Sequence, residues 1–251
     1  MNDALIQRLD ALKTSLEKRE DCLGLLALGS CADQARLDEY SDLDFFVLVE
    51  EGKQEAYLNN LDWLSDCGPL AFVFRNSIDG HKIMWQDGIY AEYAIFEASR
   101  MPDIAFTSGN FLFKKEGLNV SSHPIKPLPN HHQSIDYALN EILTNLYVGL
   151  SRYHRGEKLA AFRLIQVHAI DRLIAMIDEI ETPKTNNEDA FALDRRIEQR
   201  HPGLSEFFSQ SIQGYDHSVE VAQYILSYLH TLTILNTKMT SEIIRLIKLK
   251  K

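Results

Sequence analysis

Residues 22–49 read CLGLLALGSCADQARLDEYSDLDFFVLV, and they are the most informative residues for the architecture of the first half of the chain. An apolar run over 22–28 is closed by the Gly-Ser pair 29–30. Eleven residues later, the Asp-Leu-Asp triplet 42–44 opens a second apolar run. A short apolar run that ends at a turn residue is typical of a strand covered on both faces. The stretch therefore predicts two buried strands, 22–28 and 43–49, joined by a loop.

The two aspartates of this stretch, Asp42 and Asp44, are two positions apart. Side chains at positions i and i+2 of a strand face the same side, so we expect both carboxylates at one end of the sheet. Carboxylate and phosphate oxygens are the ligands that Mg²⁺ prefers, and water completes its octahedron. The spacing therefore predicts a magnesium site at Asp42 and Asp44.

The Gly-Ser pair adds a site for phosphate. Gly29 allows the backbone to turn tightly and to approach a ligand. The Ser30 hydroxyl and the neighbouring N–H groups, at an expected helix start, can receive phosphate oxygens. Together with the aspartates, Gly29 and Ser30 predict a site for a metal-bound triphosphate.

A third acid, Glu92, lies inside an otherwise apolar stretch, 89–96. An acid in such a strand is costly unless it has a partner. In-line displacement at a phosphate benefits from a third carboxylate that binds a second metal or takes the proton of the attacking hydroxyl. Glu92 is therefore the candidate for the catalytic base and a further metal ligand. Asp87 and Glu97, at the ends of this strand, are ranked lower.

The rest of the first half predicts a mixed sheet with helices on it. Leucines at helical spacing indicate a helix at the start of the chain, and a second helix is expected before the third strand. The expected helices cover 3–18 and 53–66, and the further strands cover 70–74, 81–85, 89–96 and 111–113.

The second half changes to helical periodicity. Residues 121–129 contain three of the seven prolines of the chain and are typical of an extended linker. Apolar residues at helical spacing then predict helices over 135–150, 159–177, 219–235 and 243–249. The sequence thus predicts an α+β protein, with a mixed β-sheet and helices over 1–130 and an all-α helical bundle over 131–251.

The Gly-Ser pair, eleven residues and Asp-x-Asp form a pattern that resembles the DNA polymerase β-like nucleotidyltransferase superfamily. The closer likeness is to lincosamide and aminoglycoside antibiotic nucleotidyltransferases. Segments similar to theirs occur in both halves and in the same order, at 40–45, 90–93, 111–117 and 155–157.

This resemblance implies that 1–130 is a nucleotidyltransferase catalytic domain and that 131–251 binds the acceptor. It implies magnesium-dependent transfer of a nucleoside monophosphate, AMP in the first instance, from an NTP such as ATP. It places metal ligands at Asp42 and Asp44 and the catalytic base at Glu92. The acceptor would be a hydroxylated small molecule, a lincosamide or an aminoglycoside, which suggests antibiotic resistance. The acceptor pocket between the domains of such enzymes is often completed by a dimer partner, so a homodimer is expected.

The charge of the chain is acidic and unevenly distributed. Residues 1–130 carry 12 lysines and arginines against 21 aspartates and glutamates, a balance of −9, and residues 131–251 carry −1. Nucleic acids bind mainly through lysine and arginine contacts to phosphates, so an acidic catalytic half argues against a nucleic-acid partner. A small acceptor is easier to accommodate.

No apolar run reaches the ~18 residues that span a bilayer, and the acidic N-terminus lacks the layout of a signal peptide. A cytoplasmic location and no membrane partner are therefore expected. The three cysteines, Cys22, Cys31 and Cys67, have no metal-site spacing and are predicted to be free thiols.

Two other functions stay open. Many superfamily members carry Arg-Gly where this chain has Asp33-Gln34, which leaves room for a nucleotide-binding regulator without turnover. The basic side chains that could instead contact the triphosphate are Arg36, Lys114 and Lys115. A protein-modifying, antitoxin-like nucleotidyltransferase is the second alternative.

Two histidine features are predicted to have no role in catalysis. His131-His132 fall in the linker, with no acid or cysteine at a metal-site spacing, and are expected to be exposed. Arg163 and His168 match the Arg-x4-His spacing of HEPN ribonucleases. On one α-helix they would lie roughly 140° apart, so packing in the core is the expected role.

Overall fold

The computed structural model describes residues 2–33 and 36–249. The chain forms two compact units, Met1–Leu128 and Pro129–Lys251. Gln34, which stands beside Asp33 in place of the usual Arg-Gly pair, lies outside the described residues. The α+β class is confirmed, because a mixed sheet with helices is followed by helices alone.

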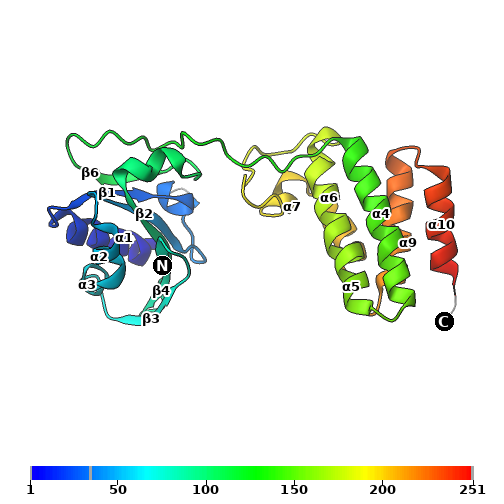
Figure 1. The fold of residues 1–251 in the computed structure, drawn as a ribbon, viewed down its shortest axis with the longest axis horizontal. Helices are drawn as coiled ribbons and strands as arrows, with labels where there is room; N and C mark the ends of the chain where they lie inside the picture. The colour runs from blue at the N-terminus through cyan, green and yellow to red at the C-terminus, as the bar shows by residue number, and fades with distance from the viewer. Residues whose placement is uncertain (1, 34–35, 250–251) are drawn as a thin grey trace. The chain divides into compact units, whose positions relative to one another are not determined.

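The first unit is built on one six-stranded sheet in the order β3-β4-β5-β2-β1-β6 (Figure 1). Neighbouring strands are antiparallel, except that β2 and β5 are parallel. The strands are β1 (Cys22–Ala27), β2 (Leu43–Val49), β3 (Leu70–Arg75), β4 (Gly80–Trp85), β5 (Tyr90–Glu97) and β6 (Asn110–Lys114).

Helices cover one face of this sheet. The leucines of α1 (Asn2–Glu17) are buried against odd-numbered side chains of β2, such as Phe45 and Val47. Two short helices, α2 (Gln54–Asn59) and α3 (Asp62–Ser65), occupy the region where one helix was predicted. The single helix is wrong because Asn60 is extended and its side chain accepts the Asp62 N–H, which starts a new helix.

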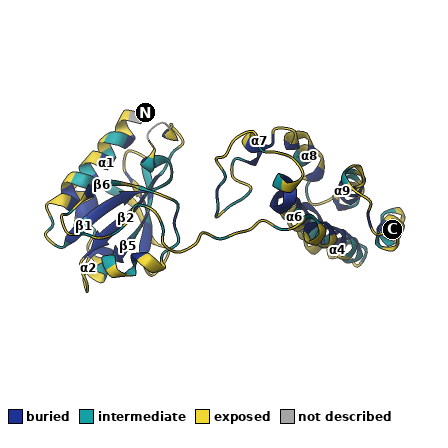
Figure 2. Cartoon of the chain, turned by 90° about the horizontal axis from the view of Figure 1, so that it is seen from above, coloured by how far each residue is buried: buried dark blue, intermediate teal, exposed yellow. Residues whose placement is uncertain are grey.

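The other face of the sheet carries the even-numbered side chains of β2 and β5, which include Asp44 and Glu92. A smaller core covers part of it, formed by Leu26, Leu48, Phe96, Met101 and Phe106. Figure 2 shows the central strands β1 and β2 as mostly buried, and β5 contains buried and half-buried residues in similar number. Toward β3 this face is open, since Phe72 and Phe74 are half exposed.

The second unit is helical and has its own core. Ser134 caps its first helix, and Gly156, with φ of +86°, follows that helix at the predicted helix–helix joint. The helices are α4 (Ile135–His154), α5 (Lys158–Arg163), α6 (Ala169–Met176), α7 (Ile197–Arg200), α8 (Leu204–Ser211), α9 (Ser218–Leu232) and α10 (Thr237–Lys248).

A π-helical turn, Leu164–His168, joins α5 to α6. It brings Gln166 into the interior, where the side-chain oxygen accepts the N–H groups of Gln213 and Gly214. The packing role predicted for Arg163 and His168 is wrong, because both residues are exposed. The segment between Arg163 and His168 is π-helical, so the angle of roughly 140° calculated for an α-helix does not apply to these two residues.

No helix in the described part of the chain is long and apolar enough to cross a membrane. The three cysteines are free thiols, as predicted, and Cys22 and Cys31 are buried.

Candidate functional site

The candidate site begins where β1 ends. Gly29 has a φ of +54°, a left-handed conformation that favours glycine, and it starts a four-residue 3₁₀ turn, Gly29–Ala32. The Leu28 N–H donates to the Asp44 carbonyl oxygen at 2.8 Å, which ties the end of β1 to the start of β2. A Cβ atom on Gly29 would lie 3.3 Å from Oδ2 of Asp44. The Asp44 carboxylate therefore lies directly against the Gly-Ser turn.

Asp44 and Glu92 are brought together by strand pairing. They are direct partners in the parallel register of β2 and β5, so their side chains stand on the same face of the sheet. Asp42 comes two positions before Asp44, just ahead of β2. Burial raises the pKa of the Tyr90 phenol first, and the Glu92, Asp42 and Asp44 charges raise it further, so all three acids act on one phenol.

The three acids converge without forming a closed metal cage. Among the described residues, their ligand atoms do not form a group in which all lie within 4.8 Å of one another. The side chains are half-buried at an open surface, where water can complete the shell of a hard cation. Oxygen donors on an accessible edge fit Mg²⁺, whose coordination usually retains several waters.

Glu92 has two partners that the sequence did not reveal. Asn76 donates to its Oε1 at 2.9 Å, and the Lys82 ammonium lies 3.2 Å from its Oε2. Lys82 is opposite Glu92 in the antiparallel register of β4 and β5. The hydrogen bond to Glu92, and then its charge, raises the pKa of Lys82. The negative charge of Glu92 is therefore balanced by Lys82 on the neighbouring strand, and 42% of the Glu92 side chain is exposed.

The three basic residues considered for the triphosphate lie in different parts of the first unit. Lys114 is paired with Gly24 in the register of β1 and β6, at the end of β1 away from Gly29. Its ammonium donates to the Val120 carbonyl, and that of Lys115 to the carbonyls of Arg19 and Glu20. Lys114 and Lys115 therefore donate to backbone carbonyls at the end of β1 away from the Gly-Ser turn.

The third basic residue is Arg36. It lies in the loop between Ser30 and Asp42, is exposed, and its backbone N–H donates to Asp33 at 2.9 Å. Its position along this loop makes it the nearest of the three proposed cations to the Gly-Ser turn in sequence.

Cys31 anchors the same loop. Its thiol donates to the Asp42 carbonyl oxygen at 3.3 Å. Burial raises the pKa of the Cys31 thiol to about 11, so it stays protonated at neutral pH. Cys31 therefore fixes the backbone before Asp44 and is no nucleophile.

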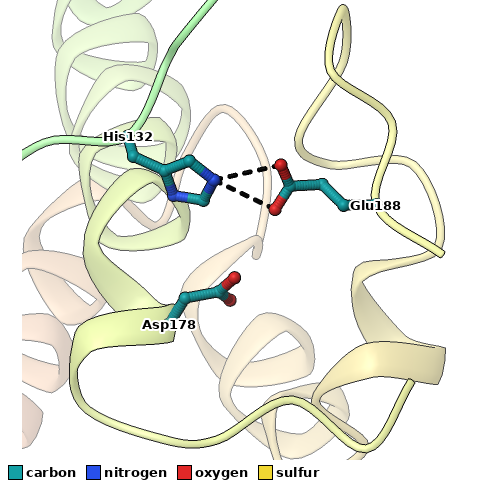
Figure 3. A group of neighbouring side chains, drawn as sticks. All are labelled: His132, Asp178 and Glu188. Carbon is teal, nitrogen blue, oxygen red and sulfur yellow. Dashed lines mark hydrogen bonds and ion pairs between the residues drawn. The ribbon is translucent and has the colours of Figure 1, made fainter. Parts of the chain in front are cut away.

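A second charged cluster lies in the helical unit. Ligand atoms of His132, Asp178 and Glu188 all lie within 4.8 Å of one another (Figure 3). Nε2 of His132 is 3.0 Å from both Glu188 oxygens, although no acid stands at a metal-site spacing in the sequence. Sequence spacing missed the pair because the two residues are 56 positions apart. His131 and His132 are exposed, as predicted.

This cluster is already neutralised by an arginine. Arg200, only 3% exposed, donates to Asp178 and lies 2.8 Å from Oε2 of Glu188. His201 adds a contact of 2.7 Å to the other Asp178 oxygen. A buried guanidinium between two carboxylates opposes a second cation, so we interpret the cluster as a structural ion-pair network.

Two of the cavities that described residues line do not contain the acids of the sheet. One, of about 420 Å³, lies in the helical unit between His131, Gln133, Asp171, Phe191 and Asp194. The other, of about 200 Å³, lies beneath Met101 and Phe106 in the first unit. These two cavities are therefore separate from the carboxylate site of β2 and β5.

No family model matches the chain, and no curated protein matches it. Solved structures are similar over most of its length. An aminoglycoside 6-adenyltransferase from Bacillus subtilis is 12% identical, with 98% of this chain and 92% of that chain covered and a TM-score of 0.36. A nucleotidyltransferase-like protein from Exiguobacterium sibiricum 255-15 is 10% identical, with 95% and 74% covered and a TM-score of 0.35.

A third structure is a STING-associated CdnE c-di-GMP synthase from Capnocytophaga granulosa. It is 11% identical, with 99% of this chain and 79% of that chain covered and a TM-score of 0.31. At these levels of similarity, the function has to be inferred from the side chains of the site.

Proposed function

We propose that the chain is a magnesium-dependent nucleotidyltransferase that moves a nucleoside monophosphate from an NTP, with ATP the first choice, to a hydroxyl of a small molecule. One observation carries the proposal. Asp44 and Glu92 are opposite each other on one face of the sheet, and the Gly29-Ser30 turn lies against Asp44. Two carboxylates beside a tight glycine turn suit a metal-bound triphosphate and an attacking hydroxyl.

In this mechanism the site residues have three roles, which are to hold the metal, to receive phosphate oxygens and to accept a proton. Asp42 and Asp44, with Glu92, would hold Mg²⁺, which when bound neutralises negative charge on the triphosphate. Ser30 and the backbone at Gly29 would receive phosphate oxygens. The acceptor hydroxyl gives its proton to a Glu92 oxygen while its own oxygen bonds to the α-phosphorus. The bond from the α-phosphorus to the β-phosphate bridging oxygen breaks, and pyrophosphate leaves.

Glu92 can take that proton while keeping its two partners. An ionised carboxylate offers about four acceptor positions on its two oxygens, and Asn76 and Lys82 occupy one each. The two donors fix the orientation of Glu92, and one free position on each oxygen remains, which leaves room for the metal and for a hydroxyl. This arrangement supports a base that is oriented before the acceptor arrives.

For the acceptor, we propose a hydroxylated small molecule, and the sequence resemblance favours a lincosamide or an aminoglycoside antibiotic. The balance of −9 on residues 1–130 supports a small acceptor over a nucleic acid. Residues 1–130 would catalyse the transfer, and residues 131–251 would contribute to holding the acceptor. The protein would then act in the cytoplasm, where NTPs are abundant.

The test is a panel of NTPs and antibiotics incubated with the full chain and Mg²⁺, read by mass spectrometry for a monophosphate adduct. We expect an adduct that is lost in Asp42→Asn, Asp44→Asn and Glu92→Gln. Glu116→Gln is the matched control, because Glu116 is an exposed acid of the same unit outside the site. Adduct formation at the wild-type rate in Asp44→Asn would reject the metal assignment.

Two other results would redirect the proposal. Binding of Mg–ATP without pyrophosphate release would favour a regulator that keeps the site without turnover. Label from α-³²P ATP that stays with protein rather than with small molecules would favour a protein-modifying transferase.

A further inference from the structure

Lys82 adds a positive charge to the face of the sheet that carries the acids. It is opposite Glu92 in the register of β4 and β5, and Glu92 is opposite Asp44 in the register of β5 and β2. Residues opposite each other in neighbouring strands stand on the same face. Within β4, Lys82 is half-buried and Met84 is exposed, while the other residues are buried. The Lys82 side chain therefore emerges on the acid face, where a ligand of the acids would meet it.

The Lys82 ammonium has hydrogen-bond donors to spare. An ammonium group carries three N–H donors and has no acceptor. The contact with Oε2 of Glu92, at 3.2 Å, takes one of them, and Lys82 forms no other hydrogen bond or ion pair with a described residue. Its side chain is 38% exposed. Two N–H donors are therefore available to a ligand without loss of the ion pair with Glu92.

The order of the strands places Lys82 and the Gly-Ser turn on opposite sides of the acids. The charged row runs from Lys82 on β4 to Glu92 on β5 and Asp44 on β2. The next strand is β1, and Gly29 follows its end. Neighbouring strands lie about 4.8 Å apart, so the backbones of Lys82 and Asp44 flank that of Glu92 at similar distances. A ligand held by the turn and by Asp44 therefore reaches Glu92 before it reaches Lys82.

In the proposed transfer, this order indicates which part of the NTP meets Lys82. The attacking and leaving oxygens lie roughly in line, on opposite sides of the α-phosphorus. The acceptor hydroxyl contacts Glu92, and the β- and γ-phosphates extend toward Gly29 and Ser30. The α-phosphate then lies between the turn and Glu92, beside the carboxylate that the Lys82 ammonium contacts. Its non-bridging oxygens are the phosphate oxygens closest to Lys82.

We propose that Lys82 is a further catalytic residue, which donates a hydrogen bond to a non-bridging oxygen of the α-phosphate of the bound NTP while it keeps its ion pair with Glu92. This inference rests on the proposed transferase function. A fixed cation beside the transferring phosphoryl group stabilises the negative charge that develops there. The chain has Asp33-Gln34 where many superfamily members carry Arg-Gly, and Lys82 supplies a cation from a different strand.

The first experiment measures binding of Mg–α,β-methylene ATP to the full chain by calorimetry. This analogue keeps both non-bridging α oxygens, and its methylene bridge is not broken by the transfer. We expect its Kd to rise at least about tenfold in Lys82→Met, the loss expected for a hydrogen bond between two charged groups. Lys82→Arg, which keeps a cation with N–H donors, should recover most of the affinity. Circular dichroism verifies that the variants are folded.

Two further variants separate a direct contact from an effect through Glu92. Asn76→Ala removes the other donor to Glu92, 2.9 Å from its Oε1, without removing a cation. Lys53→Met removes a lysine that is 46% exposed, pairs with Asp21 at 3.5 Å and follows the end of β2 away from the acids. We expect a smaller rise in Kd in Asn76→Ala than in Lys82→Met, and no change in Lys53→Met. An equal rise in Asn76→Ala and Lys82→Met would show that Lys82 only orients Glu92, and would overturn the proposal.

The second experiment identifies the atom that Lys82 contacts. In ATPαS, sulfur replaces one non-bridging α oxygen, and sulfur is a weak hydrogen-bond acceptor. The Kd of each diastereomer is measured with Mg²⁺ and without an acceptor. The wild type should bind the diastereomer whose sulfur faces Lys82 more weakly than ATP, and Lys82→Met should bind the two about equally. A Kd ratio between ATPαS and ATP that Lys82→Met leaves unchanged for both diastereomers would overturn the proposal.

These measurements also distinguish this inference from the proposed function on which it rests. A wild-type chain that does not bind Mg–α,β-methylene ATP would reject the nucleotide site itself. Wild-type binding that Lys82→Met leaves unchanged would overturn only the role of Lys82. Neither readout needs turnover or a known acceptor.

Discussion

The ammonium of Lys82 on β4 lies 3.2 Å from Oε2 of Glu92 on β5, and the two residues are opposite each other in the antiparallel register. The candidate base, Glu92, therefore forms an ion pair with a lysine of the neighbouring strand. Asp44 stands on the other side of Glu92 in the parallel register of β2 and β5. Lys82, Glu92 and Asp44 form one lateral row of charged side chains across three strands.

The first prediction concerns Lys82. Its pKa is raised chiefly by the hydrogen bond to Glu92, so the ion pair stabilises the fold below the unfolded lysine pKa of about 10.4. That contribution is lost as the pH rises through the higher folded pKa. In Glu92→Gln we expect the pKa of Lys82 to fall toward its ordinary value, measured by NMR titration of its side-chain resonance. The other lysines serve as internal references, and an unmoved midpoint would show that Glu92 is not the cause.

The second prediction separates the two acids of the row. Glu92→Gln should lower kcat by about 10²–10⁴ even at saturating Mg²⁺, the usual contribution of a general base, because the proton acceptor is lost. Asp44→Asn should instead raise the Mg²⁺ concentration needed for half-maximal pyrophosphate release, because one metal ligand is weakened. Pyrophosphate release measured across a Mg²⁺ series distinguishes them. Identical Mg²⁺ dependence in Asp44→Asn and the wild type would contradict the metal role.

The third prediction uses two glycines with similar backbones. Gly29→Ala and Gly52→Ala both place a Cβ at positive φ, +54° and +75°, and each should cost roughly 1–2 kcal/mol of unfolding free energy. Only the Cβ at position 29 lies near the site, 3.3 Å from Oδ2 of Asp44, while nothing lies within 4 Å at position 52. We expect weaker Mg²⁺ binding in Gly29→Ala alone, measured by calorimetry beside urea unfolding. Equal Mg²⁺ affinity in both variants would separate the turn from Asp44.

The fourth prediction concerns the ion-pair network of the helical unit. Arg200→Met leaves Asp178 and Glu188 without their buried cation, which should cost about 3–5 kcal/mol. Arg195→Met is the control, because the Arg195 side chain is 63% exposed and its pair with Asp189 should contribute at most about 1 kcal/mol. Hydrogen exchange of the amides in α7 and α8 reports the local loss. Similar exchange in both variants would argue against a structural role for the network.

The fifth prediction concerns acid stability. His81 on β4 is buried beside the hydroxyl of Tyr93, which belongs to β5. Desolvation, and then the charge of Arg75, lowers the pKa of His81. The unfolded chain then binds more protons than the folded chain once the pH falls below about 6.5, so stability falls from there. In His81→Asn we expect a flatter dependence of unfolding free energy on pH between neutral and mildly acidic conditions. Urea unfolding at several pH values checks this, and an unchanged slope would locate the effect in other groups.

Local patterns along the chain predict much of the fold correctly. Apolar runs bounded by turn residues predict β1 and β2, and leucines at helical spacing predict α1, because burial of one face depends only on residues near in sequence. Where local rules compete, the pattern is less accurate. Asn60 divides one predicted helix into two, and a π-helical turn interrupts the helix that contains Arg163 and His168.

Local spacing is enough to predict that Asp42 and Asp44 follow a glycine turn and that a lone acid lies in a later strand. The residues that stand beside these acids follow from the way in which distant strands pair. Strand register placed Lys82 against Glu92 and took Lys114 to the far end of β1. Chain folding also joined His132 to Glu188 across 56 positions. Such pairings depend on how distant segments align, and no spacing along the chain encodes that alignment directly.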